Sequence, residues 1–249
     1  MIESVRRLRS AHLGNDRAIW IREPRDSATS DNLVIFLDAE VYRDRIGAVS
    51  VIDAMQGEIA DSWIVFVSEE STASRRRECP CYAPFARFIA EELIQFLGRE
   101  ALDFSTVKRK ALVGVSYTGL AAAYIAKEYP ESFQNIICQS ASLWWNECWL
   151  VNEYRHFPSG YDLAFYLDVG AGENQENVGH GFVFQHVSQI DAVRRFRDVL
   201  VAGGIPTYYR EFDGGHEYDK WAQTLPHALR WCVPLESKRY RSTACVTPG

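Results

Sequence analysis

The sequence predicts a fold of the α/β class, with a mostly parallel central sheet and helices on both faces. Strand-length apolar runs alternate along the chain with longer stretches of helical pattern, an order that produces parallel strands joined by helices. Most of the strand candidates are apolar at nearly every position, as expected when both faces of a sheet are covered. With 47% apolar residues among 249, the chain has enough material for a sizeable core.

Five buried strands are predicted, with a further strand after them. In chain order, the candidates are residues 32–38, 62–68, 109–115, 133–140, 163–170 and 206–212. Closer to the N-terminus, residues 6–10 and 17–23 alternate polar and apolar side chains. This period of two predicts an antiparallel hairpin at one edge of the sheet.

Helical patterns fill the segments between these strands. They lie near residues 46–56, 83–98, 117–129, 186–203 and 217–231. No internal repeat, low-complexity segment or convincing linker interrupts the order of elements. We therefore expect a single domain over residues 1–235 and a loose C-terminal tail over residues 236–249.

The charge balance excludes several classes of partner. The chain carries 27 Lys and Arg against 33 Asp and Glu, a net charge of −6, which gives no general electrostatic reason to bind nucleic acid. No apolar run approaches the roughly 20 residues of a membrane span. The first ten residues lack the apolar core of a signal peptide. We expect an unprocessed cytoplasmic protein, and its oligomeric state stays open.

Six cysteines are spread over the chain, and we expect reduced thiols in a cytoplasmic protein. They are Cys79, Cys81, Cys138, Cys148, Cys232 and Cys245. The Cys-Pro-Cys at residues 79–81 has the wrong spacing for a redox or zinc half-site, and no second pair follows it. Neither a metal nor an organic cofactor is predicted, and whether the thiols have a chemical role stays open.

A serine stands where the buried strand 109–115 becomes a helix, in the stretch "VGVSYTG". A nucleophile elbow needs this arrangement, because its sharp turn lifts the serine Oγ out of the sheet while helix N–H groups point toward the reaction centre. Here Gly114 precedes Ser116, but Thr118 stands where the usual pattern has glycine, and Gly119 follows. The alternative is a serine that caps the N-terminus of a core helix.

A serine nucleophile needs an acid and a base, which follow it in that chain order in α/β-hydrolases. Among six histidines, His216 lies between the last predicted strand and the last helix, after two glycines that let a loop present the imidazole. For the acid, Glu173 lies in the loop after strand 163–170, where catalytic loops gather. Asp168 within that strand is the alternative. We prefer Glu173, which would orient His216 and stabilise its protonated form.

Two further features lie close to the predicted site in the order of elements. Trp144 and Trp145 follow the carboxyl end of a strand, where an aromatic side chain lines a substrate pocket or simply packs in the core. We expect at least one of them to line the pocket. The segment 178–184 combines glycines with aromatic residues and lies between the acid and the base, so it is a candidate to cover the site.

Several stretches resemble the enterochelin-esterase family, among the esterase-D-type α/β hydrolases. They are "VIFLDAEVY", "RRRECPCYAPFARFIAEELIQFL", "VGVSYTGLAAAYIAKEYPESFQNIICQSASLWW" and "FDGGHEYDKWAQTLPHAL". The last two are similar to the family's elbow, its Ser-x-Ser-x-Trp-Trp strand, and its Gly-Gly-His block with a tryptophan five residues on. The resemblance spans about residues 32–231 and implies the α/β-hydrolase fold with an antiparallel N-terminal edge.

The resemblance also implies roles for individual residues. Ser116 would be the nucleophile, His216 the base and Glu173 the acid. The oxyanion hole would use the backbone N–H of Tyr117 and one N–H from the turn at Ala39 and Glu40. A basic segment, Arg76 and Arg77, would hold an anionic or polyphenolic substrate. Two departures from the family pattern, Thr118 in the elbow and Ala39 in place of glycine, bear on the pocket and the oxyanion hole.

The resulting prediction is a serine esterase that forms an acyl-enzyme on a small-molecule ester, of an aromatic, polyphenolic or siderophore type. Acyl transfer to another alcohol would use the same residues, so hydrolysis and transfer stay open. The alternative from another class is a non-catalytic α/β-hydrolase-like binding protein, in which Thr118 has spoiled the elbow. The resemblance does not extend to the family's separate N-terminal domain, so the identity of the ester does not transfer.

Overall fold

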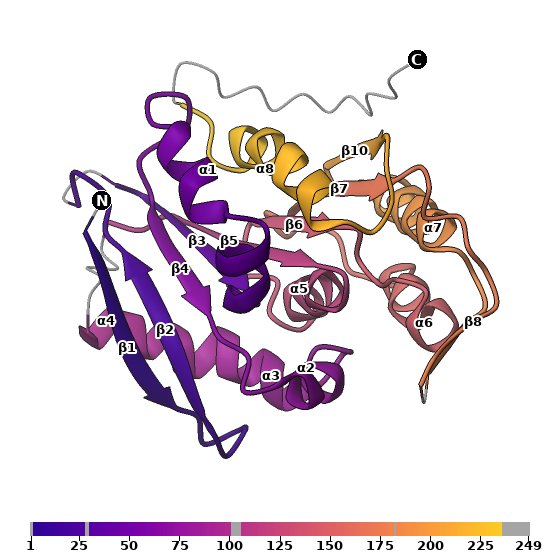
Figure 1. Ribbon diagram of the computed structural model, residues 1–249, viewed down its shortest axis with the longest axis horizontal. Helices are drawn as coiled ribbons and strands as arrows, with labels where there is room; N and C mark the ends of the chain where they lie inside the picture. The colour runs from indigo at the N-terminus through magenta and orange to yellow at the C-terminus, as the bar shows by residue number, and fades with distance from the viewer. Residues whose placement is uncertain (1, 28–29, 101–105, 182, 236–249) are drawn as a thin grey trace.

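The computed structural model describes residues 2–27, 30–100, 106–181 and 183–235. At its centre lies a sheet with the strand order β1-β2-β4-β3-β5-β6-β7-β10 (Figure 1). These strands are β1 (Glu3–Arg9), β2 (Asp16–Arg22), β3 (Asn32–Leu37), β4 (Trp63–Val67), β5 (Arg109–Val115), β6 (Asn135–Gln139), β7 (Ala164–Gly170) and β10 (Thr207–Phe212).

The sheet is parallel from β4 to β10 and antiparallel at its N-terminal edge. Strand β2 pairs antiparallel with both β1 and β4, and every other pair of neighbours is parallel. The N-terminal hairpin is therefore confirmed as an edge of the sheet. The six strands predicted between residues 32 and 212 lie within two residues of the observed bounds.

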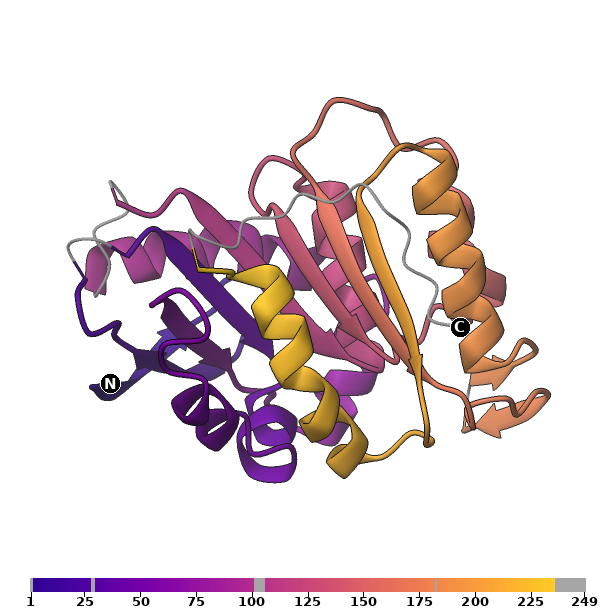
Figure 2. The same cartoon turned by 90° about the horizontal axis from the view of Figure 1, so that it is seen from above.

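Helices cover both faces of the sheet, as Figure 2 shows from above. One layer consists of η1 (Glu40–Arg45), which is a π-helical turn, α1 (Ala48–Ala54) and α8 (Tyr218–Cys232). The other layer consists of α3 (Ala83–Arg87), η2 (Phe88–Leu93), α4 (Ile94–Glu100), α5 (Tyr117–Glu128), α6 (Trp145–Tyr154) and α7 (Gln189–Ala202). Successive residues of β3 pack alternately into the two layers, because neighbouring side chains of a strand point to opposite faces. This double cover explains why the central strands are apolar throughout.

Several short elements were not predicted. The helix α2 (Thr72–Glu78) begins with a capping box between Ser71 and Ser74, and α6 begins with three residues in the left-handed conformation, at 146–148. Neither a capping box nor a left-handed first turn shows the apolar periodicity by which a helix is predicted from sequence. The segment 178–184, the candidate cover of the site, overlaps strands β8 (Val178–His180) and β9 (Val183–Gln185), which pair antiparallel.

The helix predicted over 186–203 begins later than expected. Ser188 is its N-cap and accepts a hydrogen bond from Asp191 N, so His186 lies ahead of α7 rather than within it. Within the described ranges, no helix is both long and apolar enough to cross a membrane. The single domain over 1–235 stays a prediction, and the predicted tail at 236–249 lies outside the described residues.

The parallel strands bring three loops together at one edge of the sheet. Ser116 directly follows β5, Ser140 directly follows β6, and Glu173 lies three residues beyond the end of β7. The carboxyl ends of parallel strands meet at the same edge, which is where ligands bind in open α/β sheets. The fold therefore gathers these side chains from separate parts of the chain.

Candidate active site

The turn between β5 and α5 holds Ser116 in a strained conformation, with φ of 55° and ψ of −121°. Its tightness requires glycine, because a Cβ at Gly114 would lie 2.1 Å from the backbone oxygen of Thr118. A Cβ at Gly119 would lie 2.8 Å from the Cβ of Ala141 on the neighbouring loop. Both glycines of the predicted elbow are thus explained by close backbone approach.

Thr118 fits the elbow without distorting it. Its buried hydroxyl donates to Val115 O at 2.8 Å and accepts from Val115 N at 3.0 Å. The threonine therefore ties the end of β5 to the start of α5, and it is not among the described residues that line the neighbouring cavity. Ser116 occupies the N-cap position of α5, yet its side chain makes no capping hydrogen bond with the described backbone. That geometry does not support the alternative of a simple helix cap.

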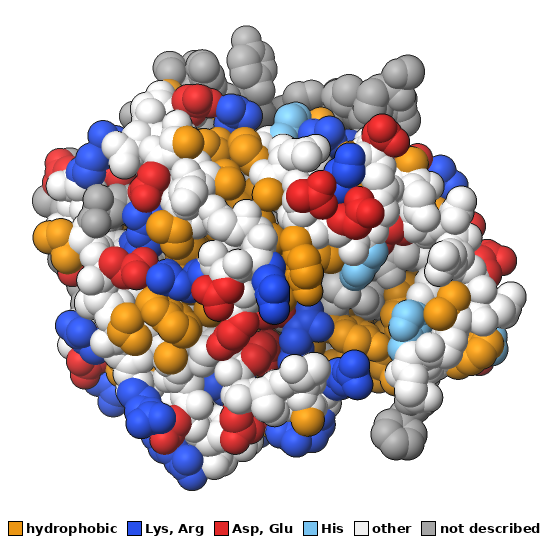
Figure 3. Space-filling model, viewed as in Figure 1, with side chains coloured by type: hydrophobic (Ala, Val, Ile, Leu, Met, Phe, Trp, Pro, Cys, Tyr) orange, Lys and Arg blue, Asp and Glu red, His pale blue; other side chains and the backbone are white. Residues whose placement is uncertain are grey.

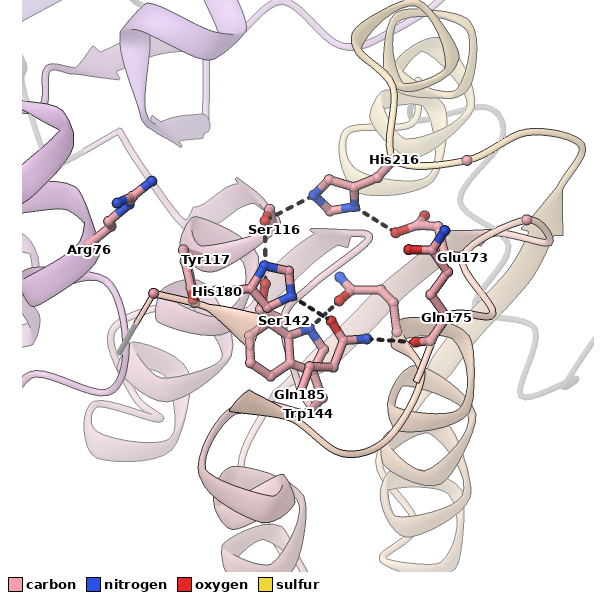
Figure 4. Close-up of a pocket in the computed structure, with 14 residues that line it drawn as sticks. Arg76, Ser116, Tyr117, Ser142, Trp144, Glu173, Gln175, His180, Gln185 and His216 are labelled. Carbon is pink, nitrogen blue, oxygen red and sulfur yellow. Dashed lines mark hydrogen bonds and ion pairs between the residues drawn. The ribbon is translucent and has the colours of Figure 1, made fainter. Parts of the chain in front are cut away.

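Ser116, His216 and Glu173 form one hydrogen-bonded chain (Figure 4). His216 Nε2 lies 3.1 Å from Ser116 Oγ, and His216 Nδ1 lies 2.6 Å from Glu173 Oε2. The His216 side chain is 44% exposed, whereas that of Glu173 is 3% exposed. The arrangement presents the imidazole to an entering ligand and keeps the carboxylate away from water, as a nucleophile, base and acid require.

The structure distinguishes between the two carboxylates that sequence reasoning left open. Glu173 contacts His216, and its second oxygen, Oε1, accepts from Ser140 Oγ at 2.5 Å and from Gly170 N at 2.8 Å. Asp168 is fully buried within β7, in register with Gln139 of β6. Asp168 does not line the cavity beside Ser116 among the described residues.

A cavity of about 630 Å³ opens beside Ser116. It lies on the face seen in Figure 3, where basic, histidine and apolar side chains gather around a hollow. Of the residues predicted to bind substrate, Arg76 and Trp144 line this cavity, and so does Tyr117. The Tyr117 and Trp144 rings lie 6.1 Å apart between centroids. One wall near Ser116 is therefore aromatic, with a cation beside it.

Two predicted substrate-binding residues lie away from the cavity. Arg77 points outward, with a 60% exposed side chain that pairs with Glu78 at 2.7 Å. Trp145 is partly buried and packs against the apolar core. Neighbouring residues of a helix point in different directions, so only one member of each pair reaches the cavity.

The turn predicted to complete the oxyanion hole lies at the start of η1. Ala39 is buried there, and Asp38 before it adopts a φ of 82°. Arg75 hydrogen-bonds to the Asp38 carboxylate and also lies 6.0 Å from the centroid of the Tyr117 ring. The Glu40 carboxylate accepts from Glu69 N at 2.9 Å. The roles of the Ala39 and Glu40 N–H groups stay predictions. Arg75 connects this turn to the elbow through its contacts with Asp38 and Tyr117.

Sequence reasoning missed a polar wall formed by the β8–β9 hairpin. His180 of β8 stacks on Trp144, with ring centroids 5.1 Å apart, and its Nε2 lies 2.9 Å from Gln185 Oε1. Gln185 in turn donates to Gln175 O at 3.1 Å. All four residues line the cavity, together with Gly181 at the hairpin turn. The segment considered as a cover thus forms a side of the cavity.

Ser142, which sequence reasoning did not single out, places a second hydroxyl beside that of Ser116. Its Oγ lies 3.3 Å from Ser116 Oγ, and its backbone N–H donates to Ser116 O at 3.0 Å. Its position in the Ser-x-Ser-x-Trp-Trp stretch was the available signal. The contact holds the loop after β6 against the elbow.

Burial of Asp168 predicts a pH-dependent loss of stability. Desolvation raises the pKa of this carboxyl from 3.8 to about 7, against smaller lowering effects of Thr224, Arg210 and Gln139. The native state therefore holds the proton more tightly than the unfolded chain. The stability that the native state gains by binding this proton is fully present below about pH 4 and is lost as the pH rises through about 7.

Asp168→Asn is expected to be more stable than wild type at pH 8, by up to about 4 kcal/mol, with the difference shrinking toward pH 4. Urea unfolding at several pH values measures it. Asp198→Asn, at a side chain that is 65% exposed, is the matched control and should track wild type. A difference between Asp168→Asn and wild type that stays constant with pH would contradict the prediction.

Comparison with known proteins gives a consistent family and fold. The family model Esterase, described as "Putative esterase", matches residues 10–232. The iron(III) enterobactin esterase of Dickeya dadantii (strain 3937) is 26% identical over 90% of this chain and 53% of its own length. That of Escherichia coli (strain K12) is 24% identical over 89% of this chain and 54% of its own length. The chain thus spans about half the length of these curated relatives.

Solved structures agree in fold. The enterobactin esterase of Shigella flexneri, determined in the presence of enterobactin, superposes with a TM-score of 0.79 at 23% identity, over 92% of this chain and 58% of that one. A ferulic acid esterase superposes with a TM-score of 0.66 at 17% identity, over 92% of this chain and 98% of that one. Both similarities are similarities of backbone fold.

Proposed function

Because the chain belongs to the Esterase family and has the α/β-hydrolase fold, we propose that it is a serine esterase that hydrolyses a carboxylic ester of a small molecule. The observation that carries the proposal is the hydrogen-bonded chain from Ser116 through His216 to Glu173, beside a cavity of about 630 Å³. A nucleophile, its base and an orienting acid within contact distance are the parts that acyl transfer needs.

In the first step, Ser116 Oγ attacks the ester carbonyl carbon while His216 Nε2 takes the hydroxyl proton. Glu173, bonded to His216 Nδ1, stabilises the imidazolium that forms. The negative charge on the former carbonyl oxygen would rest on the N–H of Tyr117 and an N–H of the turn at Ala39 and Glu40. Protonation of the leaving alcohol by His216 completes the acyl-enzyme.

In the second step, a water molecule replaces the alcohol. His216 takes a proton from this water, which attacks the acyl carbon, and the collapse of the intermediate returns the proton to Ser116. An alcohol in place of water would give acyl transfer with the same residues. Apart from the ester and the water, these steps use only groups of this chain and require no metal or organic cofactor.

The substrate we propose is an ester with an aromatic, polyphenolic or siderophore-type acyl or alcohol part. The aromatic wall of Tyr117 and Trp144, continued by the stacked His180, supports a flat ring there, and Arg76 supports an anionic or phenolic group. The names of the relatives, iron(III) enterobactin and salmochelin esterases, support the same class.

We also propose that the protein works in the cytoplasm. The described cysteines carry free thiols, which fits a reducing compartment. Burial raises the pKa of the thiols at Cys79 and Cys138 and keeps them in the unreactive neutral form.

A fluorophosphonate probe tests the proposed function without knowledge of the substrate. Folded wild-type protein is expected to gain one covalent adduct, mapped to Ser116 by mass spectrometry. Heat-unfolded protein, the control, should gain none, because the reactivity requires the assembled triad. Folded protein that takes no label would contradict the proposal and favour the binding-protein alternative.

A further inference from the structure

Trp221 contacts the histidine of the triad and is connected to its acid. It lies in the first turn of α8, where its N–H donates to Glu217 O, and its side chain is 3% exposed. The indole packs against the His216 imidazole in a T-shaped contact, with centroids 4.6 Å apart and planes at 88°. Its Nε1–H donates to Ser140 Oγ at 3.0 Å. Trp221, the tryptophan five residues after the histidine of the Gly-Gly-His block, thus packs directly against the His216 ring.

Ser140 lies between Trp221 and Glu173. It directly follows β6, is fully buried and adopts a left-handed φ of 43°, with its N–H donating to Asp168 O at 2.8 Å. The indole N–H can only donate, so Ser140 Oγ must accept from Trp221. The single hydroxyl proton of Ser140 is then left for Glu173 Oε1, 2.5 Å away. The order of donation is therefore determined: indole N–H to hydroxyl, and hydroxyl O–H to carboxylate.

This order decides which oxygen of Glu173 meets the histidine. Oε1 receives two donors, the Ser140 hydroxyl and the Gly170 N–H, while Oε2 meets His216 Nδ1 at 2.6 Å. A carboxylate held by two donors on one oxygen cannot rotate freely about its terminal torsion. The His216 ring, held by Glu173 Oε2 and by the Trp221 ring, keeps its Nε2 directed at Ser116.

We propose that Ser140 and Trp221 are positioning residues of the catalytic pair, acting through Glu173 and His216 rather than on the substrate. The inference rests on the proposed esterase function and assigns a role to two parts of the sequence that the mechanism leaves unused. These are the first serine of the Ser-x-Ser-x-Trp-Trp stretch and the tryptophan after Gly-Gly-His. Outer hydrogen-bond partners of this kind orient the groups that react.

The test measures kcat and KM for p-nitrophenyl butyrate in Ser140→Ala and Trp221→Phe. Phenylalanine keeps an aromatic ring beside the imidazole and removes the indole N–H. We expect kcat to fall about 10-fold or more in Ser140→Ala and by a smaller factor in Trp221→Phe, with KM within about twofold of wild type. Thermal melting of each variant checks that it is folded.

Matched controls exist in the chain. Trp63 is as buried as Trp221, at 3% exposure, and its indole N–H has no hydrogen-bond partner among the described residues. Trp63→Phe should therefore leave kcat unchanged. Ser62→Ala is the matched control for Ser140→Ala, because Ser62 is also buried and its hydroxyl donates to Ala60 O at 2.8 Å. This variant should likewise leave kcat unchanged.

A double-mutant cycle separates positioning from a general structural role. In a Glu173→Gln background, Ser140→Ala should lower kcat by less than about twofold, because the carboxylate that it orients is already gone. Equal losses in both backgrounds, or wild-type kcat in both single variants, would overturn the inference. Wild-type protein that neither turns over esters nor reacts with the fluorophosphonate would refute the proposed function, and the inference with it.

Discussion

Replacement of Ser116 by alanine is expected to lower kcat for aryl esters by a factor on the order of a thousand or more. The substitution removes Ser116 Oγ, which lies 3.1 Å from His216 Nε2 and is the atom we propose to form the acyl-enzyme. Binding should persist, since the cavity walls are unchanged, so KM should shift far less than kcat. The measurement is initial rate against a panel of aryl esters, from acetate to bulky aromatic acyl groups.

Ser132→Ala supplies the matched control, because Ser132 lies beyond the far end of the helix that Ser116 begins. It should keep the wild-type rate on every ester of the panel. The acyl group that wild type prefers would then indicate what the wall of Tyr117 and Trp144 accepts. Equal rates in wild type and Ser116→Ala on an ester that wild type does turn over would show that Ser116 is not the nucleophile.

Gly114→Ala is expected to destabilise the fold by at least about 3 kcal/mol, with a fall in Tm of roughly 6–12 °C. The new Cβ would lie 2.1 Å from the Thr118 backbone oxygen, 2.3 Å from its carbonyl carbon and 2.6 Å from the Gly119 nitrogen. All three atoms belong to the first turn of α5, so no flexible side chain can move aside. To relieve the clash, α5 would have to move away from β5 in the middle of the sheet.

Thermal melting and urea unfolding measure this effect. Gly179→Ala is the control, because a Cβ at Gly179 meets no described heavy atom within 4 Å and its φ is not in the left-handed region. It should melt within about 2 °C of wild type, as surface substitutions do. A Gly114→Ala variant with the same Tm as wild type would mean that the elbow is looser than the structure has it.

Much of the fold follows from local pattern. The strands were predictable because a strand covered on both faces must be apolar along nearly its whole length, and β3 and β4 show this in their sequences. The elbow was predictable because a turn this tight needs glycine at Gly114. The helices α2 and α6 were not predictable, since both are short and α6 begins with an irregular backbone that has no periodic sequence pattern.

The sequence by itself therefore determined the order of the strands along the chain, the serine at the strand-to-helix turn, and the loops that supply a histidine and an acid. Only the tertiary structure decided which side chains meet. It brought Glu173 rather than Asp168 to His216, admitted Arg76 and Trp144 to the cavity while leaving Arg77 and Trp145 outside, and added Ser140, Trp221 and the β8–β9 hairpin. The physical reason is that composition and period are properties of neighbouring residues, whereas a contact depends on backbone torsions at loops and on the register of strands far apart in the chain.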